Sequence, residues 1–286
     1  MNTQIPGDAR ELVAGVEDLF TLPEMYLRIR EAVDDSGSSI ADVAEIISGD
    51  PVITARLLRF ANSAFFGLPS QVDTISRAVN ILGTQLVHDV VLATSVSGSC
   101  AMATDALDVR QFWSSSAYCA VLSRLLAQRC HVLDSERVFL EGLLRDIGHL
   151  VMYQQIPVPI AEAQRQAISS GAELYQVERA LIGYDYGQVG QELMALWNLP
   201  PSLGEVARYH VEPASSENCP LETAIVHIAH HIAIAARSGS NVADATLPIS
   251  ADAWTVTGLS EEVIDPVRIE ADSSVTEAQQ IFIEAA

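Results

Sequence analysis

Apolar residues recur at spacings of three and four along nearly the whole chain, and the apolar–polar alternation of a half-buried β-strand is almost absent. The pattern starts after residues that cap helices well, such as Asp8 and Ser39. A chain with this periodicity buries its apolar side chains by packing amphipathic helices against one another. The sequence therefore predicts an all-α fold, a compact multi-helix bundle, with no sheet beyond an incidental pairing of two strands.

Capping residues, prolines and glycines divide this pattern into separate helices. Pro51 begins a helix that runs through Ala61, and Thr74 caps another that stops at Gly83. The segment 134–154 is apolar on most faces, which is typical of a helix at the centre of a bundle. Further helices are expected over 84–96, 108–129, 159–169, 172–182, 185–196, 200–210 and 220–237.

A Gly-Ser-rich stretch at 238–241 interrupts the helical pattern near the C-terminus. In the segments that follow, the pattern favours small helices over 259–263 and 276–286 and irregular structure over 246–256. We therefore expect three parts, namely an N-terminal helical extension over 1–14, a main domain over 15–237 and a C-terminal helical appendage over 238–286.

The chain is strongly acidic, with 37 Asp and Glu side chains against 16 Lys and Arg side chains and a net charge of −21. Such a chain repels a phosphate backbone unless its few cations are clustered, so nonspecific nucleic-acid binding is excluded. Because 49% of the residues are apolar and only 19% are charged, the chain is also too hydrophobic to be disordered. We expect a folded globular protein.

The cellular location is predicted from what the sequence contains at its N-terminus and along its length. The first ten residues lack a basic and an apolar region, and no apolar run reaches the roughly 18 residues of a membrane span. We expect a cytoplasmic protein that contacts no membrane.

The four cysteines show no CxxC pairing and have mostly apolar neighbours, so they are expected to be reduced core thiols: Cys100, Cys119, Cys130 and Cys219.

Three histidines lie close together in the predicted helix 220–237. His227, His230 and His231 are spaced three and four apart, so His227 shares a helix face with the other two and the group could hold a divalent metal. The same segment is rich in isoleucine, which favours ordinary core histidines instead. His88 and the helix-end residue His131 are expected to be structural or solvent-exposed.

A charged pair inside the apolar segment 142–150, with the sequence GLLRDIGHL, is more informative. Asp146 has apolar neighbours three and four residues away in both directions, so its side chain is predicted to point inward. A buried carboxylate needs a metal, a cation or several hydrogen-bond donors. Asp146 and its neighbour Arg145 are therefore expected to belong either to a functional site or to a structural polar cluster.

Several motifs together resemble the HDOD domain, a bacterial signalling-associated relative of the HD phosphohydrolases. The resemblance extends over about residues 15–237 and implies an all-helical fold. The segments that carry it are IISGDP at 46–51, LLRFANSAFFG at 57–67, ISRAVNILG at 75–83, GLLRDIGHL at 142–150, GYDY at 183–186 and LWNLP at 196–200.

Two of these motifs also have purely structural interpretations. Residues 184–187 form a turn and a helix cap if the carboxylate of Asp185 accepts amide hydrogen bonds. The phenylalanines of 62–67 either fill the core or stay exposed and dock a partner.

The resemblance also implies which residues correspond to the metal ligands of active HD enzymes, in which histidines and aspartates hold metals that activate water against a phosphoester. Asp146 and His210 keep ligand side chains. The other ligand positions hold Ser115, Arg145, Tyr186 and His230. Ser and Tyr are poor ligands, and Arg brings a permanent positive charge. The resemblance thus implies a protein without catalysis, metal or cofactor, in which Asp146 binds His210, His230, Tyr186 or Arg145 as a polar cluster.

The resulting functional hypothesis is regulation by protein contact in signal transduction. The expected partner is an unidentified signalling protein, with components of a nucleotide second-messenger pathway as candidates. A second hypothesis is a sensor that holds a small anionic ligand or nucleotide against Arg145. A third is a metal-dependent phosphohydrolase that uses Asp146, His210 and the histidines of 227–231 as an unorthodox ligand set.

Overall fold

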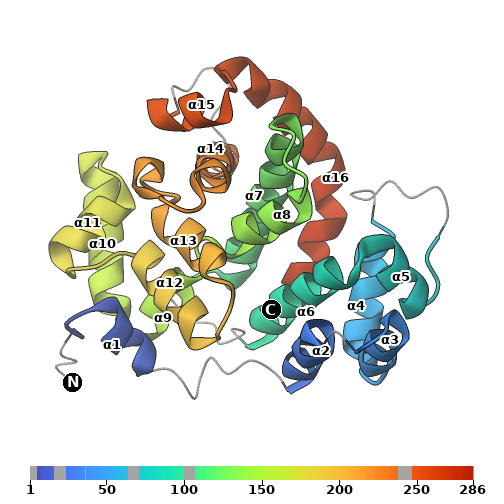
Figure 1. Cartoon of the computed structure of the whole chain (residues 1–286). Coiled ribbons are helices and arrows are strands. Elements are labelled where there is room, and N and C mark those ends of the chain that lie inside the picture. Colours follow the sequence, from blue (N-terminus) through green and yellow to red (C-terminus); the bar gives the residue numbers. More distant parts are fainter. Residues whose placement is uncertain are drawn as a thin grey trace.

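The computed structural model describes residues 5–15, 24–35, 37–63, 71–99, 107–237 and 247–285. These residues form sixteen α-helices and two short 3-10 helices, and none of them lies in a β-strand (Figure 1). The all-α prediction is therefore confirmed. Within the described part of the chain, no helix is both long and apolar enough to cross a lipid bilayer.

Most predicted helices occur close to their expected bounds, and the helix from Pro51 to Ala61 matches them at both ends. The helices before the central pair are α1 (Ala9–Ala14), α2 (Glu24–Asp34), α3 (Ile40–Ser48), α4 (Pro51–Ala61), α5 (Ile75–Leu82) and α6 (Thr84–Ser99). They are followed by α7 (Val109–Arg129), α8 (Ser135–Leu144), α9 (Gly148–Gln155), α10 (Pro157–Ser170), α11 (Leu174–Leu181), α12 (Tyr186–Leu196) and α13 (Pro201–Tyr209). The last elements are η1 (Pro213–Ser215), α14 (Pro220–Arg237), α15 (Ala251–Thr257), η2 (Glu261–Val263) and α16 (Ile264–Ala285).

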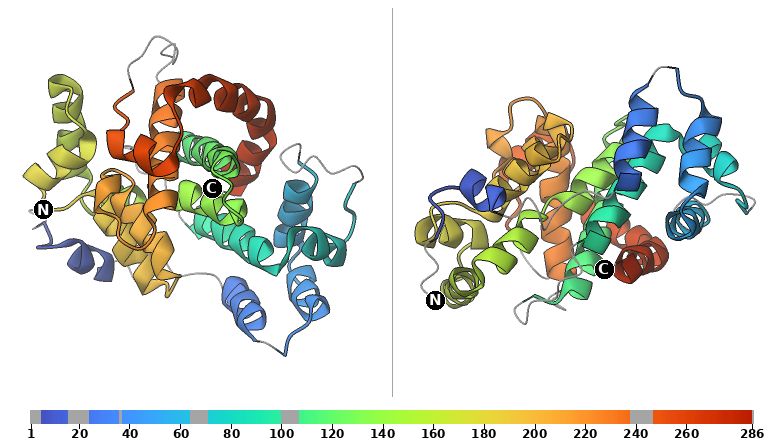
Figure 2. Two further views of the ribbon diagram at one scale, coloured as in Figure 1. Left: turned by 45° about the horizontal axis from the view of Figure 1, so that its top comes forward. Right: turned by 90° about the horizontal axis from the view of Figure 1, so that it is seen from below.

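The helices are arranged in two lobes. Helices α2 to α5 pack together as an N-terminal lobe, which lies at the lower right of Figure 1 in blue to cyan. Helix α6 links this lobe to the rest of the molecule, because it contacts α2, α4 and α5 as well as α8 and α16. Helices α7 to α14 form the C-terminal lobe, and α1 packs on its helices α12 and α9 rather than on the N-terminal lobe (Figure 2).

Helices α7 and α8 form the centre of the C-terminal lobe, and a glycine allows their close approach. A Cβ atom at Gly142 would lie 2.4 Å from Oγ of Ser123 and 3.1 Å from Cα of Ala120 on α7. Both helices bury nearly all of their apolar side chains, including Trp113 and Leu143. The tight contact fixes where the chain leaves α8, which is where Arg145 and Asp146 lie.

The prediction of one continuous helix over 134–154 is wrong, because the helix is interrupted at residues 145–147 between α8 and α9. There the backbone bonds become the shorter i to i+3 type, for example from the amide of His149 to the carbonyl of Asp146 at 3.0 Å. Close packing accompanies the interruption: a Cβ atom at Gly148 would lie 2.0 Å from the carbonyl oxygen of Tyr186 at the start of α12. The α9 backbone thus contacts α12 directly.

Two predictions for the C-terminal appendage are also wrong. Most of 246–256, expected to be irregular, belongs to α15, which Ser250 caps and which ends at Gly258 with a φ of 67°. The small helix expected over 276–286 is part of the 22-residue α16. Pro266 is harmless in the first turn of α16, where its missing N–H would have no partner. Helix α16 packs on α7, α6 and α4 through the stripe Val267, Ala271 and Val275.

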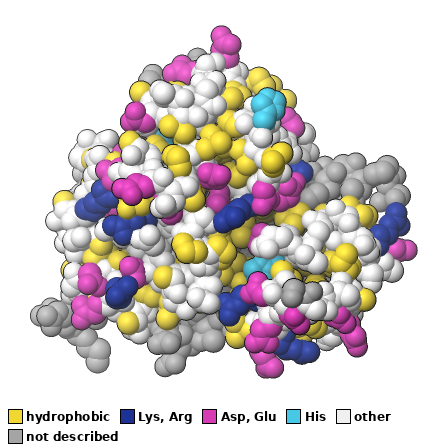
Figure 3. Space-filling view, in the orientation of Figure 1, with side chains coloured by type: hydrophobic (Ala, Val, Ile, Leu, Met, Phe, Trp, Pro, Cys, Tyr) yellow, Lys and Arg dark blue, Asp and Glu magenta, His cyan; other side chains and the backbone are white. Residues whose placement is uncertain are grey.

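The described cysteines are free thiols, and the surface charges are mostly acidic on the face that Figure 3 shows. Cys119 is buried, Cys130 and Cys219 are half-buried, and all three are free; Cys100 lies outside the described residues, as do the phenylalanines of the motif 62–67. On the face in Figure 3, acidic side chains are spread widely, and basic ones occur in small separate groups. This face therefore offers no broad basic surface for a phosphate backbone.

Candidate functional site

Arg145 lies in the interruption between α8 and α9, and its side chain is 1% exposed. The guanidinium Nη2 lies 2.7 Å from Oδ2 of Asp146, and Nε donates to Nδ1 of His230 at 3.0 Å. A third contact runs from Nη1 to the carbonyl oxygen of Gly142 at 2.9 Å. The buried charge of Arg145 is thus neutralised by one carboxylate and held in place by two further acceptors.

Asp146 is at the centre of the site, and its side chain is 14% exposed. Its second oxygen, Oδ1, lies 3.3 Å from Nε2 of His210 and 3.8 Å from Nδ1 of His230. Burial raises the pKa of the Asp146 carboxyl, but the guanidinium of Arg145, with His230 and His210 beside the carboxylate, outweighs burial and holds the pKa well below its ordinary value. Asp146 is therefore ionised at neutral pH, and its inward orientation agrees with the sequence prediction.

His210 follows α13 and is fully buried. Its Nδ1 lies 2.8 Å from the carbonyl oxygen of Ala207, so Nδ1 carries a hydrogen and donates it. Nε2 then faces Oδ1 of Asp146, and neither of these two atoms has a hydrogen-bond partner among the described residues.

A second polar group, which the sequence interpretation missed, lies beside the first. Nε2 of His149 is 3.4 Å from Oε1 of the fully buried Glu178, and Oε2 of Glu178 accepts from the backbone amide of Tyr186 at 3.0 Å. The rings of His149 and Tyr186 stack with centroids 3.9 Å apart. The position of His149, three residues after Asp146, could have indicated this pairing, whereas nothing in the sequence around Glu178 marks it as buried.

These side chains lie on the wall of a cavity of about 530 Å³. The predicted site residues Ser115, Arg145, Asp146, Tyr186 and His230 line it, and His210 lies behind Asp146. Apolar side chains complete the wall: Leu107, Phe112, Ala167, Ile168, Leu174 and Ile234. The structure thus brings the six predicted residues to one region, although the predicted hydrogen bond from Tyr186 to Asp146 is not among the described contacts. Tyr186 instead stacks on His149.

The spacing of three possible ligands in this region resembles that of a metal site, because ligand atoms of Asp146, His210 and His230 lie within 4.8 Å of one another. The bonding does not fit a divalent ion. Nδ1 of His230 accepts from Arg145, and Oδ2 of Asp146 is paired with the same guanidinium. Only two ligand atoms, Oδ1 of Asp146 and Nε2 of His210, remain without a hydrogen-bond partner among the described residues, and they lie next to a permanent positive charge. A catalytic metal site usually has three protein ligands.

The histidines on α14 do not converge on one ion either. His227 uses both ring nitrogens in hydrogen bonds, since Nδ1 lies 2.6 Å from the carbonyl oxygen of His210 and Nε2 accepts from the amide of Ser250 at 3.0 Å. Of the ligand set suggested for a phosphohydrolase, Asp146, His210 and His230 lie together, whereas His227 is engaged elsewhere. His88 is buried and pairs with Asp89 at 3.0 Å, and His131 is exposed in a turn with a φ of 58°, as expected for structural or solvent-facing histidines.

The structural interpretation of the segment 184–187 is confirmed. Asp185 caps α12, and its side chain accepts from the amide of Gln188 at 2.9 Å within a capping box. The same carboxylate pairs with Arg179, which also binds Glu212 at 2.6 Å. Asp185 therefore orients Tyr186 at the start of α12, and with it the stacked ring of His149.

Comparisons with known proteins agree with this architecture. A protein from Shewanella amazonensis described as a "Putative phosphohydrolase" is 25% identical, with a TM-score of 0.74 and coverage of 99% of both chains. A Marinobacter aquaeolei protein described as a "Putative signal transduction protein" is 20% identical, with a TM-score of 0.72 and coverage of 98% of this chain and 68% of that one. The second likeness supports the fold alone.

A relative from Treponema pallidum, named only "Uncharacterized protein", is 23% identical over 214 residues, which are 73% of this chain. The match spans 41% of the length of that relative. The sequence profile described as "HDOD domain" matches residues 19–213, which include every helix from α2 to α13 and the residues Arg145, Asp146, Tyr186 and His210. The chain therefore belongs to the HDOD domain family.

Proposed function

We propose that this protein is a non-catalytic regulatory protein that acts in signal transduction through contact with a signalling protein. The observation that carries the proposal is the position of Arg145. Its guanidinium contacts Asp146 and His230, two of the three side chains whose ligand atoms converge as in a metal site. The guanidinium of Arg145 occupies the place of a metal ion and neutralises Asp146, but it cannot bind and activate a water as a metal does.

The charges around the site also support a role without phosphoester chemistry. Asp146 neutralises the Arg145 charge within 2.7 Å, so an anionic substrate would have to compete with a carboxylate that is already in place. Two more carboxylates, those of Asp108 and Glu173, line the same cavity. The whole chain carries a net charge of −21, which adds a long-range repulsion for phosphate groups.

Membership of the HDOD domain family supports the signalling part of the proposal. The partner we propose is a signalling protein of a nucleotide second-messenger pathway in the cytoplasm. No cofactor takes part in this function. The polar cluster then has a structural role: it fixes how α8, α13 and α14 meet, since Arg145, His210 and His230 come from the ends or faces of these helices.

Metal content and hydrolysis test the non-catalytic part. The full chain would be incubated separately with manganese, iron, zinc and magnesium, freed of excess ion, and assayed with phosphomonoesters, phosphodiesters and cyclic dinucleotides. We expect less than one metal per chain and no turnover. Stoichiometric metal together with turnover that disappears in Asp146→Ala would overturn the proposal.

Partner capture from native cells tests the protein-contact part. The full chain would be cross-linked in cells to capture its partner. The captured protein would then be purified and titrated against the wild-type chain. We expect saturable binding of a signalling protein at micromolar or tighter affinity. A thermal-shift response to nucleotides in the absence of any such partner would instead favour the sensor hypothesis.

A further inference from the structure

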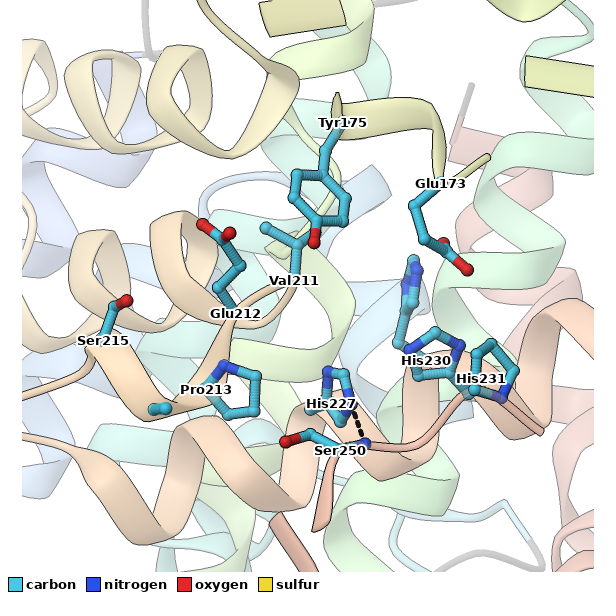
Figure 4. A pocket seen from close by; sticks show the side chains of 12 residues that line it. Glu173, Tyr175, Val211, Glu212, Pro213, Ser215, His227, His230, His231 and Ser250 are labelled. Carbon is cyan, nitrogen blue, oxygen red and sulfur yellow. Dashed lines mark hydrogen bonds between the residues drawn. The ribbon is translucent and has the colours of Figure 1, made fainter. Parts of the chain in front are cut away.

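A second cavity, of about 370 Å³, lies between α14, the loop around η1 and the segment before α15. Its wall includes His227, His230, His231, Glu173 and Ser250 (Figure 4). We call it the histidine pocket. Much of the wall lies after residue 213, where the match to the HDOD domain ends, so the pocket is built largely by this chain outside the family domain. Its volume is at the small end of ligand cavities in proteins.

The C-terminal appendage closes one side of the histidine pocket. The amide of Ser250 donates to Nε2 of His227 at 3.0 Å, as the dashed line in Figure 4 marks. Nδ1 of His227 carries the hydrogen that it donates to the carbonyl oxygen of His210. A ring that donates through Nδ1 and accepts through Nε2 is neutral, and burial accordingly lowers the pKa of His227 to about 4. His227 therefore joins α14 to the appendage.

The imidazole of His231 is one polar group of the pocket that lacks a partner among the described residues. The residue is buried, and its ring contacts the rings of His227 and His230 at centroid distances of 4.5 and 5.3 Å. Among the described residues, neither of its ring nitrogens has a hydrogen-bond partner. Burial and the neighbouring rings lower its pKa to about 3, so His231 is neutral and offers one nitrogen lone pair.

Glu173 supplies the charge of the pocket. It stands at the N-cap of α11, yet its side chain makes no capping hydrogen bond, and within the described part of the chain it has no ion-pair partner. Figure 4 shows its carboxylate pointing toward the rings of His230 and His231. Glu212, the other acidic side chain of the wall, is already paired with Arg179 at 2.6 Å. Glu173 is thus the acidic group of the pocket without an ion-pair partner among the described residues, and burial accordingly raises its pKa.

The chemistry of the wall excludes two classes of ligand. None of the described residues that line the pocket is Lys or Arg, and its histidines are neutral, so an anion would meet only negative charge. A metal ion is disfavoured because, among the described residues, the only convergent set of ligand atoms is that of Asp146, His210 and His230. A half-buried carboxylate beside a neutral imidazole acceptor is complementary to a cation that carries N–H donors.

We propose that the histidine pocket binds an alkylammonium group, which pairs with Glu173 and donates a hydrogen bond to His231. The ammonium group belongs either to a small free amine or to a lysine side chain of a partner. This inference goes beyond the regulatory function proposed above, because it gives the chain a ligand in a pocket that adjoins the Arg145–Asp146 cavity and shares Glu173 and His230 with it. It does not depend on that function being correct.

Titration calorimetry of the full chain tests the proposal with three compounds of equal length: 1,4-diaminobutane, the uncharged 1,4-butanediol and the dianion succinate. We expect saturable binding of one diamine per chain and no binding of the other two. Glu173→Gln should weaken diamine binding by about tenfold or more, which corresponds to about 1.4 kcal/mol. His231→Leu should also weaken it, with the circular dichroism spectrum unchanged. Tighter binding of a short lysine peptide than of the diamine would identify a partner lysine as the source of the ammonium group.

The matched control separates a site from the general attraction between an acidic protein and an amine. Glu217→Gln removes the same charge from an exposed position near η1 that does not line the pocket, and it should leave the affinity unchanged. Equal losses from Glu173→Gln and Glu217→Gln would overturn the proposal, because bulk charge would then account for the binding. Absence of saturable diamine and peptide binding to the wild-type chain would overturn it as well.

Discussion

Removing the carboxylate of Asp146 should destabilise the protein more than the loss of a hydrogen bond would. In Asp146→Ala, the guanidinium of Arg145 stays 1% exposed and loses the counter-ion 2.7 Å away. Leaving one charge of a buried pair unpaired costs about 3–5 kcal/mol, against about 1–3 kcal/mol for an orphaned hydrogen-bond group. Because Asp146 is itself 14% exposed, some water can replace it, so we expect a loss of about 3 kcal/mol in the free energy of unfolding.

The double variant Arg145→Met/Asp146→Ala distinguishes a buried charge from lost packing. Methionine keeps much of the arginine volume but carries no charge, so the double variant should recover most of the stability that Asp146→Ala loses. Chemical denaturation followed by circular dichroism at neutral pH gives the free energy of unfolding, provided the slope with denaturant concentration is the same in all variants. Glu162→Ala is the control, since its partner Arg165 is 72% exposed and such pairs contribute at most about 1 kcal/mol.

Two results would refute this reasoning. If Asp146→Ala changed the free energy of unfolding by no more than the Glu162→Ala control, the carboxylate would not be compensating a buried charge. If the double variant were as unstable as Asp146→Ala alone, the cost would come from lost packing and not from the unpaired Arg145.

Three further predictions concern pH and close packing. Burial lowers the pKa of His227 to about 4, below its unfolded value of about 6.5, so stability should fall as the pH drops through that window; His227→Gln should reduce this fall in acid denaturation curves. Burial raises the pKa of Glu141 to about 8, above its unfolded value of about 4.3, so its contribution is lost as the pH rises through that interval. The stability of Glu141→Gln relative to wild type should therefore be greater near pH 9 than near pH 5. Melting temperatures of both proteins at the two pH values would show this. Gly148→Ala should cost about 1–3 kcal/mol or more, because its Cβ would meet the carbonyl of Tyr186 at 2.0 Å. Gly204→Ala, whose Cβ would meet side-chain carbon at 3.4 Å, should be tolerated in the same melting experiment.

The helices could be predicted because they depend on local information. The cap Ser39, the proline at Pro51 and the cap Asp185 act within one or two turns, and the structure shows all three in these roles. The interruption at 145–147 could not be predicted in this way. It coincides with the approach of Gly148 to Tyr186, a contact between residues nearly forty positions apart, whereas apolar residues resume directly after the charged pair Arg145 and Asp146.

The appendage shows the same limit. Pro266 and the polar residues around it favour short or broken helices when the segment is considered alone. In the structure the segment forms the 22-residue helix α16, which packs on α7, α6 and α4. This helix buries Val267, Ala271 and Val275. Tertiary packing outweighs a weak local preference, because most of the stability of a helix in a protein comes from its buried face.

For the polar cluster, the sequence predicts that the carboxylate of Asp146 faces inward, because hydrophobic periodicity surrounds it with apolar neighbours. The resemblance to the HDOD domain implies that Arg145 occupies a metal-ligand position, where the permanent charge of its guanidinium opposes a metal. Three features depend on the tertiary structure: the groups that satisfy that carboxylate, the second pair that His149 and Glu178 form beside it, and the position of Glu173 opposite His231 in the histidine pocket. These pairings join helices distant in the chain, and contacts at that range follow from how the helices pack and not from the order of residues along any one of them.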